Sequence, residues 1–265
     1  MQSNKHLKKI VKEKYTEIAG QSQNSCCGSE SSCTPDYSQF SEDYSQLTGY
    51  NPDADLSLGC GLPTQFAKIR KGDTVIDLGS GAGNDCFVAR AETGESGKVL
   101  GIDMTEAMIE NARRNADKLG FQNVTFRIGD IESLPVDDNF ADVVVSNCVL
   151  NLVPDKTKAF SETLRVLKPG GHFSISDVVL KGTLPDVLQE AAVLYAGCVS
   201  GALQKEDYLA IIKQTGFQNI TIQKEREIIL PENLLKQYLS EDELNTFQQN
   251  PVGIFSITVY AEKPD

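Results

Sequence analysis

The stretch 75-VIDLGSGAGND-85 predicts the end of a buried strand, a tight turn and the start of a helix. Asp77 closes an apolar run, and Gly79, Gly81 and Gly83 follow at alternate positions. Such a turn needs glycine because a Cβ atom would keep the backbone from approaching a ligand closely. Taken alone, the pattern fits either a plain strand–helix turn or a dinucleotide site. Its meaning therefore depends on the sequence around it.

Strand-like and helix-like runs alternate on both sides of this turn, from about Pro63 to Lys181. Helical patterns cover residues 84–92, 106–119 and 156–167. They are interleaved with five strand-like runs, TVIDLG, KVLGID, NVTFRIGD, ADVVVSN and GHFSISDVVL. This alternation predicts an α/β fold in which helices cover both faces of a mostly parallel sheet.

We expect three parts in the chain. Residues 1–57 would form a leading helix and an irregular, cysteine-containing connector rich in Ser, Gln, Asn, Asp and Tyr. Residues 58–181 would form the sheet domain. Residues 182–265 would form a smaller C-terminal α+β portion, with helices near 187–195 and 205–215. These helices precede the strand NITIQKEREI, two short helices and the final strand GIFSITVYAE.

The composition favours a cytoplasmic protein. A chain of 265 residues with 40% hydrophobic content can bury a full core. The net charge of −12 argues against a nucleic acid or an anionic membrane as partner. The leading helix lacks the apolar region of a signal peptide, and no apolar run approaches the length of a membrane span. Because cytosolic thiols stay reduced, seven cysteines favour ligand, redox or core roles over a disulfide scaffold.

Two further acidic residues end predicted strands. Asp103 closes the second strand, where a carboxylate can accept both ribose hydroxyls of a nucleoside, and Asp130 ends the third strand.

A dehydrogenase is the rival interpretation, because a nicotinamide cofactor also binds glycines and an acid. Its loop normally has the spacing GxGxxG, with phosphates at the helix N-terminus. Here Asn84 and Asp85 directly follow Gly83, which places a carboxylate where the pyrophosphate would bind.

Three acidic strand ends and a GxGxG turn resemble the class I S-adenosylmethionine-dependent methyltransferases over roughly residues 60–180. The resemblance implies a Rossmann-like, mostly parallel sheet of seven strands and an S-adenosylmethionine site in residues 58–181. The implied cofactor residues are Asp77, Gly79, Gly81 and Gly83 for the methionine part, Asp103 for the ribose, Met104, Asp130 and Ile131 for the adenine, and Asn147.

The histidines offer little guidance to the chemistry, but the cysteines are informative. The chain has only His6, in the leading helix, and His172, which we interpret as a structural residue inside a strand. Cys86 follows the glycine turn within a helix and fits a plain core role. Cys60 stands between glycines in LGCGLP. Cys148 follows the fourth strand, at the edge where open α/β sheets bind ligands.

Several longer sequence motifs resemble those of the arsenite S-adenosylmethionine methyltransferases, particularly the bacterial ones: NPDADLSLGCGLP, DLGSGAGND, VVSNCVLNLVPD, RVLKPGG and YAGCVSGA. The resemblance runs from the leading helix to the last strand. It implies methyl transfer from S-adenosylmethionine to trivalent arsenic, for detoxification, by a monomer. Soft thiolates select a soft centre such as As(III), whose lone pair can attack the methyl carbon. No protein base is then needed for the transfer, and positioning would supply much of the rate.

The family pattern has four cysteines. Matched residue by residue, they are Cys26 or Cys27, Cys60, Cys148 and Cys198. By this likeness Cys148 and Cys198 retain arsenic throughout methylation. Cys60 completes the first three-thiolate site and, with the N-terminal thiol, supplies reducing equivalents by forming a disulfide. Thioredoxin or glutathione would then restore the thiols.

Three alternatives stand beside this assignment. A carbon methyltransferase acting on a quinone-like or sterol-like acceptor shares the GxGxG and GID motifs, but it does not require Cys60, Cys148 and Cys198. A non-catalytic protein that sequesters thiophilic metalloids would not need the intact cofactor residues. A structural zinc site built from Cys26, Cys27, Cys33 and Cys60 is disfavoured, because adjacent cysteines lack the usual CxxC spacing. Cys33 is also the weakest match for the N-terminal thiol.

Overall fold

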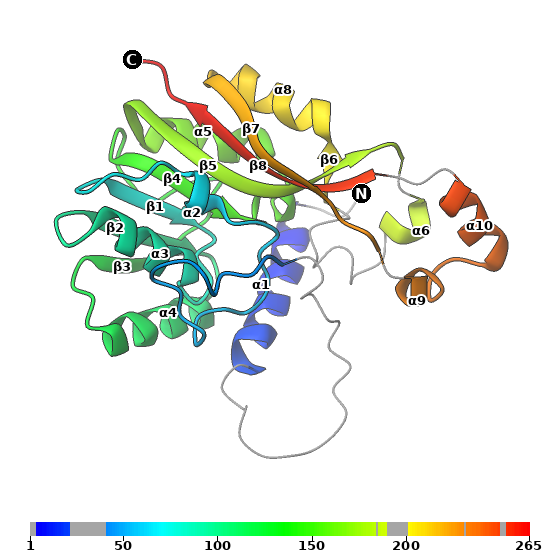
Figure 1. Ribbon diagram of the computed structural model, residues 1–265, viewed down its shortest axis with the longest axis horizontal. Coiled ribbons are helices and arrows are strands. Elements are labelled where there is room, and N and C mark those ends of the chain that lie inside the picture. Colours follow the sequence, from blue (N-terminus) through cyan, green and yellow to red (C-terminus); the bar gives the residue numbers. More distant parts are fainter. Residues whose placement is uncertain (1–3, 22–40, 184, 190–200, 231, 250–252) are drawn as a thin grey trace.

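The computed structural model describes residues 4–21, 41–183, 185–189, 201–230, 232–249 and 253–265, which follow the predicted alternation (Figure 1). The strands are β1 (Thr74–Leu78), β2 (Lys98–Asp103), β3 (Val124–Ile128), β4 (Ala141–Asn147), β5 (Leu167–Lys181), β6 (Leu203–Gln204), β7 (Gln218–Glu227) and β8 (Gly253–Glu262). The helices are α1 (Asn4–Gln21), α2 (Pro63–Phe66), α3 (Asn84–Thr93), α4 (Glu106–Leu119), η2 (Leu150–Leu152), α5 (Lys156–Val166), α6 (Asp186–Gln189), α8 (Lys205–Thr215), α9 (Glu232–Leu235) and α10 (Glu241–Gln249).

One mixed sheet organises the described residues, in the order β3-β2-β1-β4-β5-β8-β7, with β6 paired to β5. Neighbours from β3 to β5 are parallel, whereas β8 is antiparallel to both β5 and β7. The predicted mostly parallel α/β fold is therefore confirmed. β1 lies between β2 and β4, so the order of strand addition reverses there. In open α/β sheets, ligands bind outside the carboxyl ends of the strands at such a switch point.

The sheet has one strand more than the seven predicted. β5 is 15 residues long, but its pairing with β4 ends at Ser176. The two-residue β6 pairs with β5 farther along, at Val179 and Leu180. A two-residue strand has no periodic pattern, which is why the sequence does not predict it.

Most other predicted elements agree with the structure to within a residue or two. The helix predicted near 187–195 begins as α6 at Asp186, and its later part lies outside the described residues. The third strand ends at Ile128 rather than at Asp130, which instead forms an isolated bridge with Ser133.

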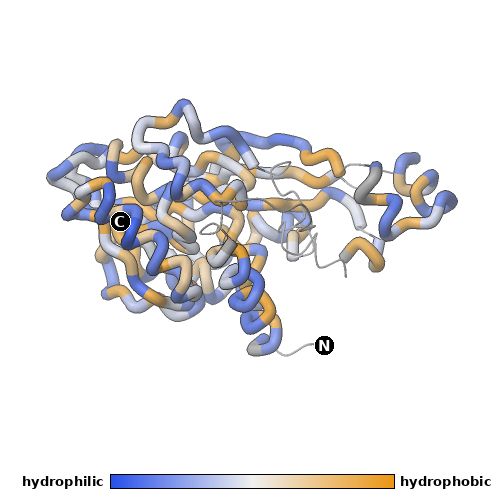
Figure 2. The backbone as a smooth tube through the Cα atoms, turned by 90° about the horizontal axis from the view of Figure 1, so that it is seen from below, coloured by the Kyte–Doolittle hydropathy of each residue, from blue (hydrophilic) through white to orange (hydrophobic). Residues whose placement is uncertain are grey.

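Helices cover both faces of the sheet, as predicted. Alternate strand residues point to opposite faces, and Val75 and Ile76 accordingly belong to different apolar clusters. The Val75 cluster includes side chains of α3 and α4, whereas the Ile76 cluster includes side chains of α5 and α8. Figure 2 shows hydrophobic segments along the strands, and alternating hydrophobic and hydrophilic segments along α1.

The far ends of β5, β7 and β8 extend beyond the parallel strands toward α6, α9 and α10 (Figure 1). A separate apolar cluster packs there, with Val178, Leu180 and Ile254 from the strands and Leu188, Leu235 and Leu244 from the helices. The same cluster contains Cys60 and Cys148. The extension therefore adjoins the carboxyl edge of the sheet, where the predicted thiols lie.

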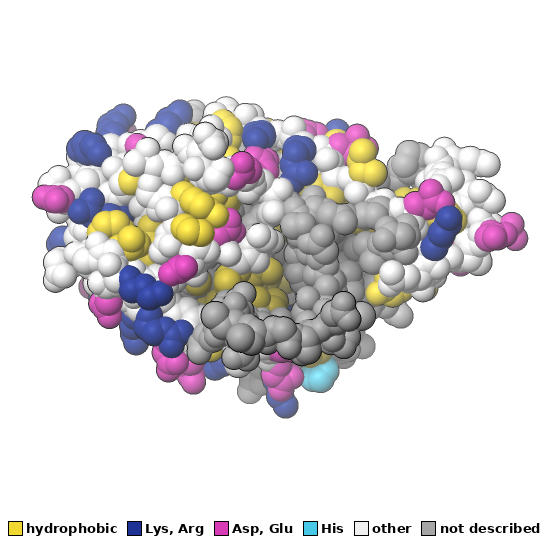
Figure 3. Space-filling view, turned by 60° about the horizontal axis from the view of Figure 1, so that its bottom comes forward, with side chains coloured by type: hydrophobic (Ala, Val, Ile, Leu, Met, Phe, Trp, Pro, Cys, Tyr) yellow, Lys and Arg dark blue, Asp and Glu magenta, His cyan; other side chains and the backbone are white. Residues whose placement is uncertain are grey.

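No helix in the described ranges is both long enough and apolar enough to cross a bilayer. On the face in Figure 3, acidic and basic side chains occur in small groups of both signs.

Candidate active site

A pocket of about 980 Å³, partly open to solvent, lies at the switch point of the sheet. Of the predicted cofactor residues, its lining includes Asp77, Gly79, Gly81, Asp103, Met104, Ile131 and Asn147. Gly83 and Asp130 lie outside this lining. Cys148 is part of the lining as well, so the pocket brings one predicted arsenic ligand next to the predicted cofactor residues.

The glycine turn adopts a backbone that other residues tolerate poorly. Gly79 has a φ of 73°, and a Cβ atom there would lie 2.3 Å from a side-chain carbon of Val149. Gly83 has a φ of 101° and forms the N-cap of α3, where a Cβ atom would lie 2.8 Å from the ring of Phe87. Gly83 therefore shapes the start of the helix, whereas Gly79 and Gly81 face the pocket.

Two of the predicted carboxylates, Asp77 and Asp103, are held in place by the turn and helix beside them. Asp103 accepts hydrogen bonds from the backbone N–H groups of Gly81, at 3.0 Å, and Thr105, at 2.8 Å. Asp77 accepts one from the thiol of Cys86 at 3.2 Å. Burial raises the pKa of Asp103, and burial together with the charge of Asp85 raises the pKa of Asp77 well above its usual value.

A third carboxylate, Asp85, was not assigned a binding role from the sequence. It accepts hydrogen bonds from the hydroxyl of Tyr44, at 2.8 and 3.0 Å, and from the amide of Asn147 at 3.3 Å. Burial raises the pKa of Asp85 to about 6, although these hydrogen bonds act in the opposite direction. The sequence could have indicated a binding role for Asp85, because an acid directly after a glycine turn lies at the helix N-terminus beside any bound ligand.

The pocket is therefore strongly acidic. Its described lining contains four aspartates and no lysine, arginine or histidine. A bound cation would offset the cost of burying these carboxylates. The lining suits a positively charged ligand with hydroxyl groups for Asp103, and it does not suit a pyrophosphate.

Helix α1 covers one side of the pocket, which the sequence did not predict. Val11 and Tyr15 of this helix are lining residues. Lys8 forms ion pairs with Asp130, at 2.5 Å, and Glu132, at 2.6 Å. Asp130, which the sequence analysis assigned to the adenine, is thus paired with a residue of α1 and helps to hold that helix over the pocket.

Asn147 links the pocket to the loop that carries Cys60. Its amide oxygen accepts hydrogen bonds from the backbone N–H groups of Cys60, at 3.0 Å, and Gly61, at 3.3 Å. Its amide nitrogen donates to the carbonyl of Gly61, at 2.8 Å, and to the hydroxyl of Tyr44, at 2.5 Å. One side chain therefore contacts both the acidic pocket and the first predicted arsenic ligand.

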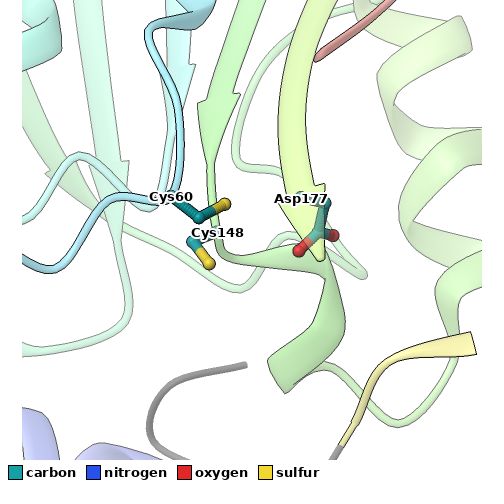
Figure 4. A group of neighbouring side chains, drawn as sticks. All are labelled: Cys60, Cys148 and Asp177. Atoms are coloured by element: carbon teal, nitrogen blue, oxygen red, sulfur yellow. The ribbon is translucent and has the colours of Figure 1, made fainter. Parts of the chain in front are cut away.

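Cys60 and Cys148 meet at the carboxyl edge of the sheet, and both thiols are buried (Figure 4). Cys148 is the first residue after β4, and its N–H donates to the carbonyl of Ser176 in β5 at 2.8 Å. It has a φ of 59°, in the left-handed region that residues with a Cβ rarely occupy. Such strain is concentrated at functional sites.

Asp177 of β5 faces the two thiols and was missed by the sequence analysis. Its carboxylate oxygen and the two sulfur atoms all lie within 4.8 Å of one another. Burial raises the pKa of Asp177 to about 7, although the charge of Lys156 acts in the opposite direction. The sequence could have indicated Asp177, because it is a charged residue within the apolar run GHFSISDVVL.

The remaining predicted residues fall into two groups. Cys26, Cys27, Cys33 and Cys198 lie outside the described residues. His172 lies away from the pocket lining, with its Nε2 atom 2.6 Å from the carbonyl oxygen of Ala67. Burial lowers the pKa of His172, so the ring is held neutral in a structural hydrogen bond. This agrees with its interpretation as a structural residue.

Comparison with known proteins identifies the fold and the family. Residues 69–216 match a family described as a methyltransferase domain. The crystal structure of an arsenic(III) S-adenosylmethionine methyltransferase from Chlamydomonas reinhardtii is similar to this chain, with a TM-score of 0.66 and 37% sequence identity. The similarity covers 78% of this chain and 68% of that one. The chain belongs to the arsenite methyltransferase family.

Sequence relatives agree with this placement in the arsenite methyltransferase family. An arsenite methyltransferase from Halobacterium salinarum is 42% identical over 228 residues, which cover 81% of this chain and 58% of that protein. The chain thus spans a little over half the length of this curated relative. A demethylmenaquinone methyltransferase from Symbiobacterium thermophilum is 34% identical over 106 residues, or 40% of this chain. The likeness to arsenite methyltransferases extends over about twice as much of the sequence.

Proposed function

We propose that this protein transfers a methyl group from S-adenosylmethionine to trivalent arsenic held by cysteine thiolates, producing methylated arsenicals for detoxification. The observation that carries the proposal is the position of Cys148. Its side chain belongs to an acidic pocket suited to a cationic cofactor, and its sulfur lies beside that of Cys60. Family membership supplies the prior expectation, and this juxtaposition gives it a chemical basis.

The pocket residues fit S-adenosylmethionine by the chemistry of their side chains. The cofactor has a sulfonium and an ammonium group, which suit a pocket lined by Asp77 and Asp85. Asp103 would accept the ribose hydroxyls, and Met104 and Ile131 would contact the adenine. When bound, the sulfonium supplies an electrophilic methyl group. The chain orients the cofactor through the glycine turn and limits water access with α1.

The thiols would hold arsenic next to that methyl group. As(III) is soft and binds thiolates in preference to oxygen ligands. We assign Cys60, Cys148 and Cys198 as its three ligands, with Cys148 nearest the cofactor. The arsenic lone pair attacks the methyl carbon, so the protein contributes mainly by positioning the two reactants. The carbon–sulfonium bond would break as the arsenic–carbon bond forms, S-adenosylhomocysteine would leave, and arsenic would be oxidised from As(III) to As(V). Cys60 and Cys26 or Cys27 would then return it to As(III) by giving up two electrons and forming a disulfide, which a thiol reductant such as thioredoxin or glutathione reduces.

The alternative functions gain less support. A quinone-like or sterol-like acceptor would require no soft ligands, yet the buried thiol of Cys148 lines the pocket and the buried thiol of Cys60 lies beside it. A metalloid-binding protein without activity would not require the acidic lining with Asp77 and Asp103. We further propose that the protein acts as a cytoplasmic monomer.

The test is incubation of the reduced protein with S-adenosylmethionine, As(III) and glutathione, followed by chromatographic separation of the arsenic species. We expect methylated arsenic from the wild-type protein and none from the Cys148→Ser variant. A demethylmenaquinone substrate is included in parallel. Methylation of that substrate without any methylated arsenic would replace the arsenic proposal with the carbon methyltransferase.

A further inference from the structure

Cys60, Cys148 and Asp177 come together from three separate segments of the chain (Figure 4). Cys60 lies in the loop before α2, Cys148 directly after β4, and Asp177 within β5. One donor atom from each lies within 4.8 Å of the other two, and all three residues are buried. Donor atoms around a tetrahedral Zn²⁺ are separated by about 3.5–3.8 Å. Small side-chain rotations would therefore bring these three atoms to the spacing of a metal site.

Asp177 is buried, and the charge of Lys156 offsets the cost of that burial only in part, because burial still raises the pKa of its carboxyl to about 7. Its hydrogen-bond donors are the Tyr208 hydroxyl, at 3.3 Å, and the backbone N–H groups of Val178 and Asn151. A fully buried carboxylate is costly unless a cation offsets its charge. The adjacent thiols would add further negative charge if they ionised. A divalent cation between the three residues would offset all of these charges.

We propose that Cys60, Cys148 and Asp177 form a binding site for a thiophilic divalent cation, with Zn²⁺ as the natural occupant. Two sulfur ligands and one oxygen ligand suit Zn²⁺, which accepts both and binds four donors in tetrahedral geometry. Mg²⁺ and Ca²⁺ favour all-oxygen sites, so the thiols select against them. Tyr208 would orient the carboxylate, as groups around the ligands of metal sites commonly do.

Occupancy by Zn²⁺ would have a direct functional consequence. The ion would use the two thiols that the proposed reaction requires for As(III), so the two cannot bind there together. As(III) forms three bonds and keeps a lone pair, and it gains little from a carboxylate ligand. Asp177 therefore distinguishes the two ligands, since it should matter for Zn²⁺ but not for As(III).

The experiment is an anaerobic titration of the reduced full-length protein with Co²⁺, the spectroscopic substitute for Zn²⁺, without S-adenosylmethionine or arsenic. All proteins carry serine at Cys26, Cys27 and Cys33, so that these thiols do not contribute. We expect one equivalent of Co²⁺ to give thiolate-to-cobalt charge-transfer bands, and Zn²⁺ to abolish them. Asp177→Asn should weaken binding at least tenfold, and Cys60→Ser and Cys148→Ser should remove the bands.

Two controls make the outcomes decisive. Cys86→Ser removes a buried thiol outside the cluster and should leave the bands unchanged. As(III) affinity, measured separately, should be the same in Asp177→Asn as in the parent protein. Unchanged Co²⁺ affinity in folded Asp177→Asn, or bands that survive in Cys60→Ser, would overturn the proposed site. Neither result depends on methyl transfer, so failure of the metal site is distinguishable from failure of the proposed function.

Discussion

The side-chain oxygen of Asn147 accepts a hydrogen bond of 3.0 Å from the backbone N–H of Cys60, 87 residues away in the sequence. Asn147 is also the residue before Cys148. One amide therefore fixes the position of the loop carrying the first thiol relative to the second thiol. This contact, and not any local sequence spacing, holds the two proposed arsenic ligands next to each other.

Asn147→Ala should separate the two thiols. The variant leaves the N–H groups of Cys60 and Gly61 without their acceptor, and we expect it to lower the free energy of unfolding by about 1–3 kcal/mol. As(III) affinity should fall more than S-adenosylmethionine affinity, because Asp77 and Asp103 remain in place. Denaturant unfolding and two calorimetric titrations measure these changes. Equal losses of both affinities would show that Asn147 does not specifically position Cys60.

S-Adenosylmethionine binding should weaken at low pH. The cationic cofactor requires ionised carboxylates, and the pKa of Asp85 is raised to about 6. Affinity should therefore fall as the pH drops through 6, by up to about tenfold per unit. Calorimetry from pH 5 to 8 checks this. Asp85→Asn should reduce the slope, and S-adenosylhomocysteine, which lacks the sulfonium charge, should show a weaker dependence. An affinity that rises with falling pH would contradict the acidic-pocket interpretation.

The stability of the protein should also depend on Asp177. Burial raises the pKa of Asp177 to about 7, well above the ordinary value of an aspartate, so the folded state binds the proton more tightly than the unfolded state does. The free energy of unfolding should then decrease as the pH rises from about 4 to 7. At pH 8, Asp177→Asn should be more stable than the wild type by about 1–4 kcal/mol. Urea unfolding with a chelator present, at pH 8 and pH 5, tests this. A variant that is less stable at pH 8 would mean that the charge is compensated in the folded protein.

The cysteines should have separable roles in methyl transfer. As(III) needs three thiolates, whereas a trivalent monomethylarsenical has only two exchangeable positions. Cys60→Ser should therefore abolish methylation of As(III) but spare the monomethylated substrate when external reductant is in excess. Cys148→Ser and Cys198→Ser should abolish both reactions. Methyl transfer to each substrate is the measurement, with thermal melts as the check on folding.

Cys86→Ser is the matched control for these variants. A serine hydroxyl can still donate to Asp77, so both reactions should persist. Full activity toward As(III) in the Cys148→Ser protein would refute the thiol assignment as a whole.

His172→Gln should leave methylation largely intact. The arsenic lone pair needs no base, and His172 is already in a hydrogen bond with the carbonyl of Ala67. Glutamine keeps a donor for that carbonyl. Steady-state turnover of the folded variant is the test. A fall of about a hundredfold, the scale of a lost general acid or base, would contradict a mechanism that relies on thiols alone.

Local patterns predicted the sheet and several residues that line the acidic pocket. Asp77 and Asp103 were found because each ends an apolar run, and parallel strands bring their carboxyl ends to one edge. The glycine turn was found because its backbone conformation is restricted to glycine at Gly79. These features depend on residues close together in the sequence.

Other parts of the site depend on contacts between distant segments, which carry no periodic signal. The ion pair of Lys8 with Asp130 spans 122 residues, and nothing in the sequence indicated that Asp130 would contact α1. Asp177 appeared in the sequence as an acid within an apolar strand. Its proximity to two thiols follows only from the pairing of β4 with β5 and from the loop before α2.

The left-handed backbone conformation of Cys148 lowers the stability of the fold relative to a glycine at the same position. A residue with a Cβ in that conformation costs about 1 kcal/mol or more, and glycine would relieve the cost. A redesign guided only by folding energy would therefore choose glycine at position 148 and remove the thiol that the proposed reaction requires. In the proposed function, cysteine at this position supports reactivity at a cost in folding energy. Consensus or computational stabilisation of this protein should hold that position fixed.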